Sequence, residues 1–105
     1  MRIPLASLRI GQQRCVAFEG ASVLICRTEG GVFAIENQCP HAQFPLAGGA
    51  VVSETIRCPT HGAKFDLRTG APLTNPRLAP VRTFGVTLDG DCVTLQPKNA
   101  AETSD

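Results

Sequence analysis

Apolar and polar residues alternate over short stretches of this chain, and turns rich in glycine separate the stretches. The clearest alternation runs through Phe84, Val86 and Leu88, which a strand would place on one face because its side chains alternate with a period of two. No window of helical length shows an apolar period of 3.6 residues. The pattern predicts strands at residues 14–18, 22–27, 32–36, 51–52, 55–57, 63–67, 82–88 and 92–95. Short strands joined by frequent turns are typical of an all-β sandwich or barrel.

The middle of the chain departs from this pattern because it is rich in proline. Six of the eight prolines fall between residues 37 and 80, and both histidines fall there too. Binding residues are often carried by loops that a rigid scaffold positions. We therefore expect one domain over residues 1–105 with a loop-rich functional part at about residues 37–80. Residues from about 97 to 105 are polar and small, which predicts a flexible tail.

Composition narrows the function classes. The chain has 105 residues, of which 43% are hydrophobic and 18% charged, with a net charge of +1, so it reads as one globular domain without a nucleic-acid-binding surface. No stretch approaches the roughly 20 apolar residues of a membrane helix, and residues 1–10 lack the pattern of a signal peptide. We expect a cytoplasmic protein. In that reducing compartment its five cysteines are better explained as ligands or core residues than as disulfides.

Two short motifs in the middle of the chain combine cysteine with histidine. One is Cys-Pro-His at residues 39–41, and the other is Cys-Pro-Thr-His-Gly at residues 58–62, with sixteen residues between His41 and Cys58. Each motif offers one thiolate and one imidazole, so the pair suits a [2Fe–2S] cluster with two Cys on one iron and two His on the other. A single tetrahedral zinc ion is the alternative, although zinc modules commonly place Cys pairs before His pairs. Four unrelated buried side chains are the remaining alternative.

These motifs resemble the signature of the Rieske iron–sulfur family, and the resemblance continues through Phe-Asp-Leu-Arg-Thr-Gly at residues 65–70. The resemblance implies a fold of stacked antiparallel sheets, with residues of about 37–80 as a cluster-binding subdomain. It also implies one Rieske-type [2Fe–2S] cluster per chain. Cys39 and Cys58 would hold the inner iron, and His41 and His61 the outer iron near the surface.

The short length resembles the ferredoxin components of bacterial aromatic ring-hydroxylating dioxygenases. That likeness implies a monomeric electron carrier, not an enzyme, which takes electrons from a ferredoxin reductase and passes them to a terminal oxygenase. The small Rieske subunit of an assimilatory nitrite reductase is the alternative of similar size, and a structural zinc module is a third. A stand-alone oxygenase would need a second iron site with further histidines, and the chain has only two.

Four positions indicate the branch of the family. Quinol-oxidising relatives have a disulfide whose two cysteines would fall at Phe44 and Thr60, so this chain departs from them. High-potential relatives have hydroxyl groups where this chain has Ala63 and Phe65. Hydrogen bonds to sulfur stabilise the reduced cluster, so their absence predicts a potential at the low end of the Rieske range, on the order of −150 mV.

The remaining expectations concern packing and docking. Cys15, Cys26 and Cys92 lie in predicted strands without histidine nearby, so we expect them to be strand or core residues. The loop from Pro72 to Pro80 is expected to cover the cluster. Because the net charge is small, we expect weak long-range steering and a partly apolar docking patch around the two histidines, with Phe44 at its rim.

Overall fold

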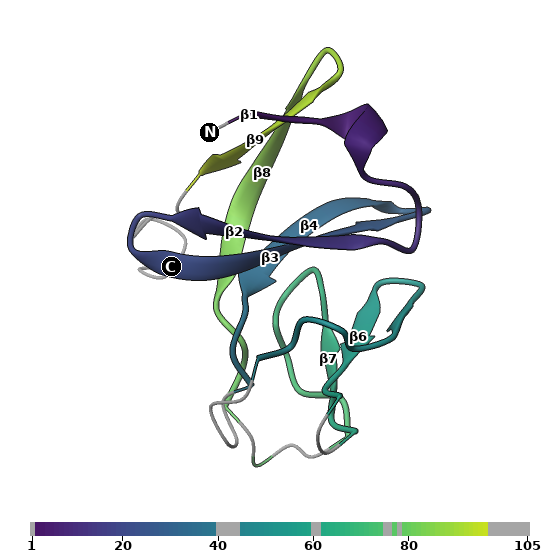
Figure 1. Cartoon of the computed structure of the whole chain (residues 1–105). Helices are drawn as coiled ribbons and strands as arrows, with labels where there is room; N and C mark the ends of the chain where they lie inside the picture. Colours follow the sequence, from purple (N-terminus) through teal and green to yellow (C-terminus); the bar gives the residue numbers. More distant parts are fainter. Residues whose placement is uncertain (1, 40–44, 60–61, 75–76, 78, 97–105) are drawn as a thin grey trace.

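The structure is a computed structural model that describes residues 2–39, 45–59, 62–74, 77 and 79–96. Figure 1 shows antiparallel strands joined by turns and loops, with one short 3-10 turn, which confirms the predicted all-β class. The described strands are β1 (Arg2–Pro4), β2 (Gln13–Phe18), β3 (Ala21–Thr28), β4 (Gly31–Glu36), β5 (Val51–Val52), β6 (Thr55–Arg57), β7 (Lys64–Asp66), β8 (Thr83–Asp89) and β9 (Cys92–Gln96), with a 3-10 turn at Leu5–Ser7. Within the same residues, no helix has the length and apolar character needed to cross a bilayer.

The larger sheet has six strands in the order β1-β9-β8-β4-β3-β2. Its strands β2, β3 and β4 form a meander whose first turn is Glu19-Gly20, with φ angles of 52° and 81°. Two successive positive φ angles are the hairpin turn geometry that matches strand twist, and glycine favours it. β8 pairs with β4 at only two positions and then continues alone with β9.

The smaller sheet has three strands in the order β5-β6-β7. It lies below the larger sheet in Figure 1, on the side where β4 ends and β8 begins. The turn Ser53-Glu54 joins β5 to β6, with Ser53 at a φ of 53°. The sequence pattern predicts this hairpin, and the structure confirms it.

Two separate groups of buried side chains hold the chain together. One lies within the larger sheet and contains Ile3, Leu8, Val23, Ile25, Ala34, Phe84, Val93 and Leu95. The other joins the opposite face of β3 and β4 to the smaller sheet and contains Leu24, Cys26, Ile35, Cys39, Leu46, Ile56, Cys58, Ala63, Phe65, Leu67 and Val81. Alternate residues of β3 therefore serve different cores, as the period of two in a strand requires.

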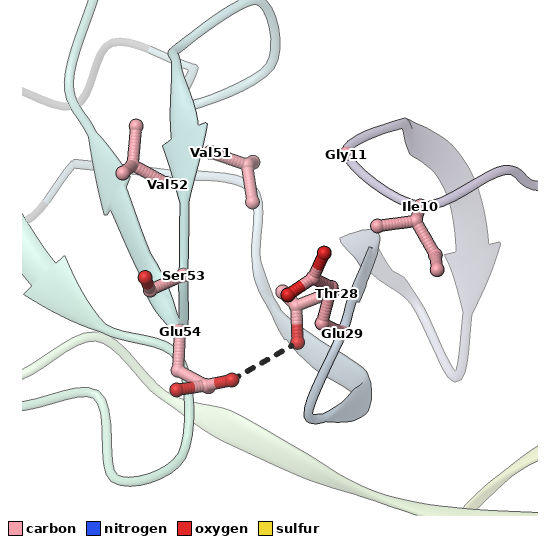
Figure 2. Close-up of a pocket in the computed structure, with 8 residues that line it drawn as sticks. All are labelled: Ile10, Gly11, Thr28, Glu29, Val51, Val52, Ser53 and Glu54. Carbon is pink, nitrogen blue, oxygen red and sulfur yellow. Dashed lines mark hydrogen bonds between the residues drawn. The ribbon is translucent and has the colours of Figure 1, made fainter.

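A polar contact joins the two sheets where their hairpin turns meet, which Figure 2 shows in close-up. Thr28 at the end of β3 donates a hydrogen bond to Glu54 Oε2 at 3.4 Å and accepts one from the Gly30 amide at 3.0 Å. A Cβ atom on Gly30 would meet the Glu54 carboxylate, so a larger residue there would require the Glu54 side chain to move. A hollow of about 360 Å³ lies beside this contact, partly lined by Ile10 and Val52.

Two features of the larger sheet go beyond the sequence prediction. β1 was not predicted, because three residues carry no alternation; it forms by pairing with β9, with Ile3 opposite Val93. Phe84, Val86 and Leu88 share one face of β8, as predicted, but Leu88 on that face is 53% exposed. β8 pairs with β4 only at Thr83 and Phe84, so Leu88 lies beyond the part of the sheet where these two strands meet.

Candidate metal centre

The two cysteines of the sequence motifs come to the same buried region. Cys39 lies just beyond the end of β4, and Cys58 directly follows β6. Their exposed fractions are 0% and 1%, and both belong to the core between the two sheets. The structure thus brings the predicted sulfur ligands together, while His41 and His61 lie outside the described residues.

Two backbone hydrogen bonds close the second motif into a compact loop. The amide of Cys58 donates to the Ala63 carbonyl at 2.6 Å, and the Gly62 amide donates back to the Cys58 carbonyl at 2.9 Å. Gly62 has a φ of 76°, which glycine adopts without strain. Because β6 leads into this loop and β7 leads out of it, the small sheet positions Cys58 from both sides.

One side chain of the larger sheet and one just after its strand β4 hold the returning end of the first motif loop. Asn37 Oδ1 accepts hydrogen bonds from the amides of Leu46 and Ala47 at 2.9 and 2.8 Å. Gln13 on β2 accepts from the Gly48 amide at 2.6 Å and donates to the Gly49 carbonyl at 2.7 Å. Four consecutive residues are therefore fastened by two side-chain amides, so the loop starts and ends at fixed points.

The sequence motifs did not reveal these two positioning residues. Asn37 stands two residues before Cys39, and asparagine commonly hydrogen-bonds nearby backbone groups, which is a signal that could have found it. Gln13 gives no such signal, because it acts on residues 35 and 36 positions away in sequence. Only the docking of the loop against β2 reveals its role.

The segment after β7 turns back along the small sheet. Pro72 pairs with Phe65, and the Leu73 amide donates to the Lys64 carbonyl at 2.8 Å. Thr74 Oγ1 accepts from the Lys64 amide at 3.2 Å. The start of the predicted proline-bearing cover is therefore attached to β7. Pro76 lies outside the described residues, and Pro80 is exposed.

A hollow of about 440 Å³ opens beside Cys58. Its lining includes Arg57, Pro59 and Gly62 on one side and residues 48–50 on the other. A Cβ atom at Gly49 would collide with the Arg57 carbonyl, so the two loops approach as closely as glycine allows. The ends of both motif loops thus meet at this hollow.

The other three cysteines lie in strands, as the sequence predicts. Cys15 in β2 is exposed, Cys26 in β3 is buried, and Cys92 in β9 is intermediate. All five cysteines are among the described residues, and none forms a disulfide. Burial raises the pKa of the Cys26 thiol from an ordinary 9.0 to about 12.

The donor set fits an iron–sulfur cluster better than the alternative, a single tetrahedral zinc ion. Two buried thiols sit at the ends of loops whose sequences each add one imidazole, which is the donor set of a Rieske [2Fe–2S] cluster. Within the residues that the structure describes, no group of three or more His, Cys, Asp and Glu side chains could hold a metal ion. When bound, such a cluster stores and releases one electron, and this chain supplies its ligands and its apolar surroundings.

The family model of the Rieske [2Fe–2S] domain matches residues 3–85 of this chain, which includes both motifs. The chain belongs to the Rieske [2Fe–2S] family. It is 36% identical over 81 residues to the ferredoxin component of biphenyl 2,3-dioxygenase from Rhodococcus jostii, an alignment that covers 77% of this chain and 76% of the relative.

Solved structures of Rieske ferredoxins have the same fold. The ferredoxin of carbazole 1,9a-dioxygenase from Nocardioides aromaticivorans has a TM-score of 0.84 and 37% identity, covering 91% of this chain and 94% of that one. A chain in a complex of reduced oxygenase and oxidised ferredoxin of carbazole 1,9a-dioxygenase has a TM-score of 0.83 and 26% identity, covering 93% and 96%. A nitrite reductase small subunit from Mycobacterium tuberculosis, at 19% identity and a TM-score of 0.80, shares the fold alone.

Within this Rieske chain, the positions that mark the branch are both buried and apolar where they are described. Ala63 is 9% exposed and Phe65 is fully buried, and both pack in the core that contains Cys58. Neither has a hydroxyl group to offer to a sulfur atom. Phe44 and Thr60, which replace the disulfide of quinol-oxidising relatives, lie outside the described residues.

Proposed function

We propose that this chain is a one-electron carrier that takes electrons from a ferredoxin reductase and delivers them to a terminal ring-hydroxylating oxygenase. Its relatives over most of their length are ferredoxin components of dioxygenase systems. The observation that carries the proposal is the placement of Cys39 and Cys58 in one buried core at the ends of two loops. With one Rieske cluster and no further metal site in its motifs, the chain supplies electrons to an enzyme and turns over no substrate itself.

We further propose that Cys39 and Cys58 bind the inner iron and that His41 and His61 bind the outer iron. The burial of both thiols supports their assignment to the inner iron, because thiolates within the core are shielded from water. The chain would act as a single cytoplasmic domain over residues 1–105, a monomer, with residues of about 37–80 as its cluster-binding subdomain. The joining of those residues into a core with the small sheet supports that division.

Purified holoprotein tests the cofactor and the ligands together. We expect two irons per chain and the visible and electron paramagnetic resonance spectra of a Rieske cluster. Replacing Cys39, His41, Cys58 or His61 should abolish or convert these spectra, whereas C15A, C26A and C92A should retain them. Zinc in place of iron, or retention of the native spectrum in C39A, would contradict the proposal. Reoxidation of the reduced protein by a ring-hydroxylating oxygenase tests the function itself.

A further inference from the structure

We infer that Arg57 and Lys64, here called the basic pair, bind an acidic surface of the reductase that transfers an electron to this chain. This inference rests on the proposed function, because it assigns one partner of the electron carrier. The two residues face each other across the β6–β7 ladder, and both side chains are exposed. Directly opposed residues in antiparallel strands place their side chains on the same face.

The basic pair lies beside the cluster-ligand loop. Arg57 precedes Cys58, and its guanidinium lies against Gly62, since a Cβ there would be 3.3 Å from Arg57 Nε. Lys64 begins β7 just after the same loop ends. The two positive charges therefore flank the loop that carries Cys58 and His61.

In the part of the chain that the structure describes, no carboxylate forms an ion pair with the basic pair. Among the described residues, neither Arg57 nor Lys64 has an acidic group within ion-pair distance. Glu54 is at the far end of the hairpin, where it pairs with Arg68 at 3.7 Å and accepts from Thr28. Asp66 shares the face with Lys64 but turns one oxygen to the Arg68 amide at 2.8 Å.

The basic pair costs stability, which favours a binding role. Like charges opposite each other across two strands destabilise the ladder, and among the described residues no carboxylate, Asp66 included, lies within ion-pair distance to offset that cost. An acidic surface on a partner protein would offset this cost. The net charge of the whole chain is only +1, but the charged residues between 37 and 65 are Glu54, Arg57 and Lys64. The region around Arg57 and Lys64, called the positive end below, therefore carries more positive charge than the net charge suggests.

The redox change selects the reductase over the oxygenase as the acidic partner. Two ferric ions, two sulfides and two thiolates are formally neutral, and reduction adds one negative charge. The positive end is therefore strongest in the oxidised protein, which is the form that a reductase must bind. Once the electron has arrived, the attraction weakens and favours release of the reduced carrier.

Two small oxidants of opposite charge test the positive end without any protein partner. Hexacyanoferrate(III), a trianion, and hexaammineruthenium(III), a trication, each take one electron from the reduced holoprotein and become the corresponding (II) complexes. In the variant R57Q/K64Q we expect the rate constant with hexacyanoferrate to fall and that with hexaammineruthenium to rise. The ratio of the two should drop by up to about tenfold at low ionic strength. A change of potential would move both rates in the same direction, so it cannot mimic this result.

The matched control is R9Q/R14Q, which removes one positive charge from the segment before β2 and one from β2 itself. Both double variants change the net charge from +1 to −1, so they differ only in where the charge is lost. The control should leave the ratio of rate constants near the native value. Equal ratios in native protein and R57Q/K64Q would contradict the inference of a positive end. They would not contradict the proposed cluster or its role in electron transfer.

Stopped-flow reduction of the oxidised holoprotein by a reductase that serves it tests the choice of partner. We expect the second-order rate constant to fall with rising salt and to fall by up to about tenfold in R57Q/K64Q at low salt. The rate of electron delivery to the oxygenase should change less than the rate of loading. A larger loss on the oxygenase side, or no loss on the reductase side, would overturn the assignment to the reductase.

Discussion

Asn37 and Leu46 are joined by a hydrogen bond of 2.9 Å from the Leu46 amide to the Asn37 side-chain oxygen, nine residues apart in sequence. The same oxygen accepts from the Ala47 amide, so one side chain fastens the returning end of the loop that begins at Cys39. Leu46 is fully buried in the core that contains Cys39 and Cys58, the two proposed ligand cysteines. The position of the first ligand loop therefore depends on a residue that binds no metal.

Replacing Asn37 by alanine should loosen this loop. N37A removes the two hydrogen bonds that Oδ1 accepts and the two that Nδ2 donates, to Cys15 Sγ at 3.4 Å and Ser22 Oγ at 3.3 Å. It is expected to lower the free energy of unfolding by about 1–3 kcal/mol. The matched control is N37D, which keeps an acceptor oxygen at the same position and should stay closer to the native protein. Urea unfolding measures the stability, and thermal loss of visible absorbance measures retention of the cluster. Equal rates of cluster loss in N37A and the native protein would contradict the positioning role.

The apolar residues Ala63 and Phe65 predict how the potential can be raised. A63S and F65Y each introduce a hydroxyl beside the core that contains Cys58, where high-potential relatives have one. A hydrogen bond of roughly 0.5–1.5 kcal/mol corresponds to a rise on the order of 20–60 mV for a one-electron couple. Protein-film voltammetry measures the shift, with A63G as a control that adds no hydroxyl. No rise in either variant would refute the hydrogen-bond explanation of the low potential.

Cys26 predicts a loss of stability at high pH. Its thiol is protonated in both states below pH 9, but above that only the unfolded state ionises until the folded pKa of about 12 is reached. The free energy of unfolding should therefore fall as pH rises through this window, by up to about 4 kcal/mol across the whole of it. Urea unfolding of native protein and C26A from about pH 8 to about pH 11 measures the two slopes. The slope in C26A should be smaller, and parallel slopes would refute the assignment.

Leu88 and Leu95 provide a matched pair for the packing of the larger sheet. Leu88 is 53% exposed at the far end of β8, whereas Leu95 on β9 is 4% exposed. We expect L95A to lower the free energy of unfolding by about 2–5 kcal/mol and L88A by less than about 0.5 kcal/mol. Chemical denaturation of the two variants measures the difference. Similar losses would mean that a surface absent from this chain covers Leu88.

The local pattern of the sequence determined most of the strands and pointed to Cys39 and Cys58 as the sulfur donors. Alternation with a period of two predicts β8, and short apolar runs bounded by turn residues predict β2, β3, β4 and β9, because both signals lie within a few residues of sequence. The spacing of Cys39 and Cys58 with histidines nearby predicts the donor set in the same way, since ligand chemistry depends on residue type. These signals need no knowledge of what lies across the fold.

Only the tertiary structure decided the features that depend on distant neighbours. β1 exists because β9 offers it a partner, and Leu88 is exposed because β8 outruns β4. Gln13 reaches the first ligand loop across 35 residues or more, and Arg57 and Lys64 become one positive surface only when β6 and β7 pair. Burial, hydrogen bonding and local charge are set by what packs against a residue, and a single sequence does not state which distant residues meet.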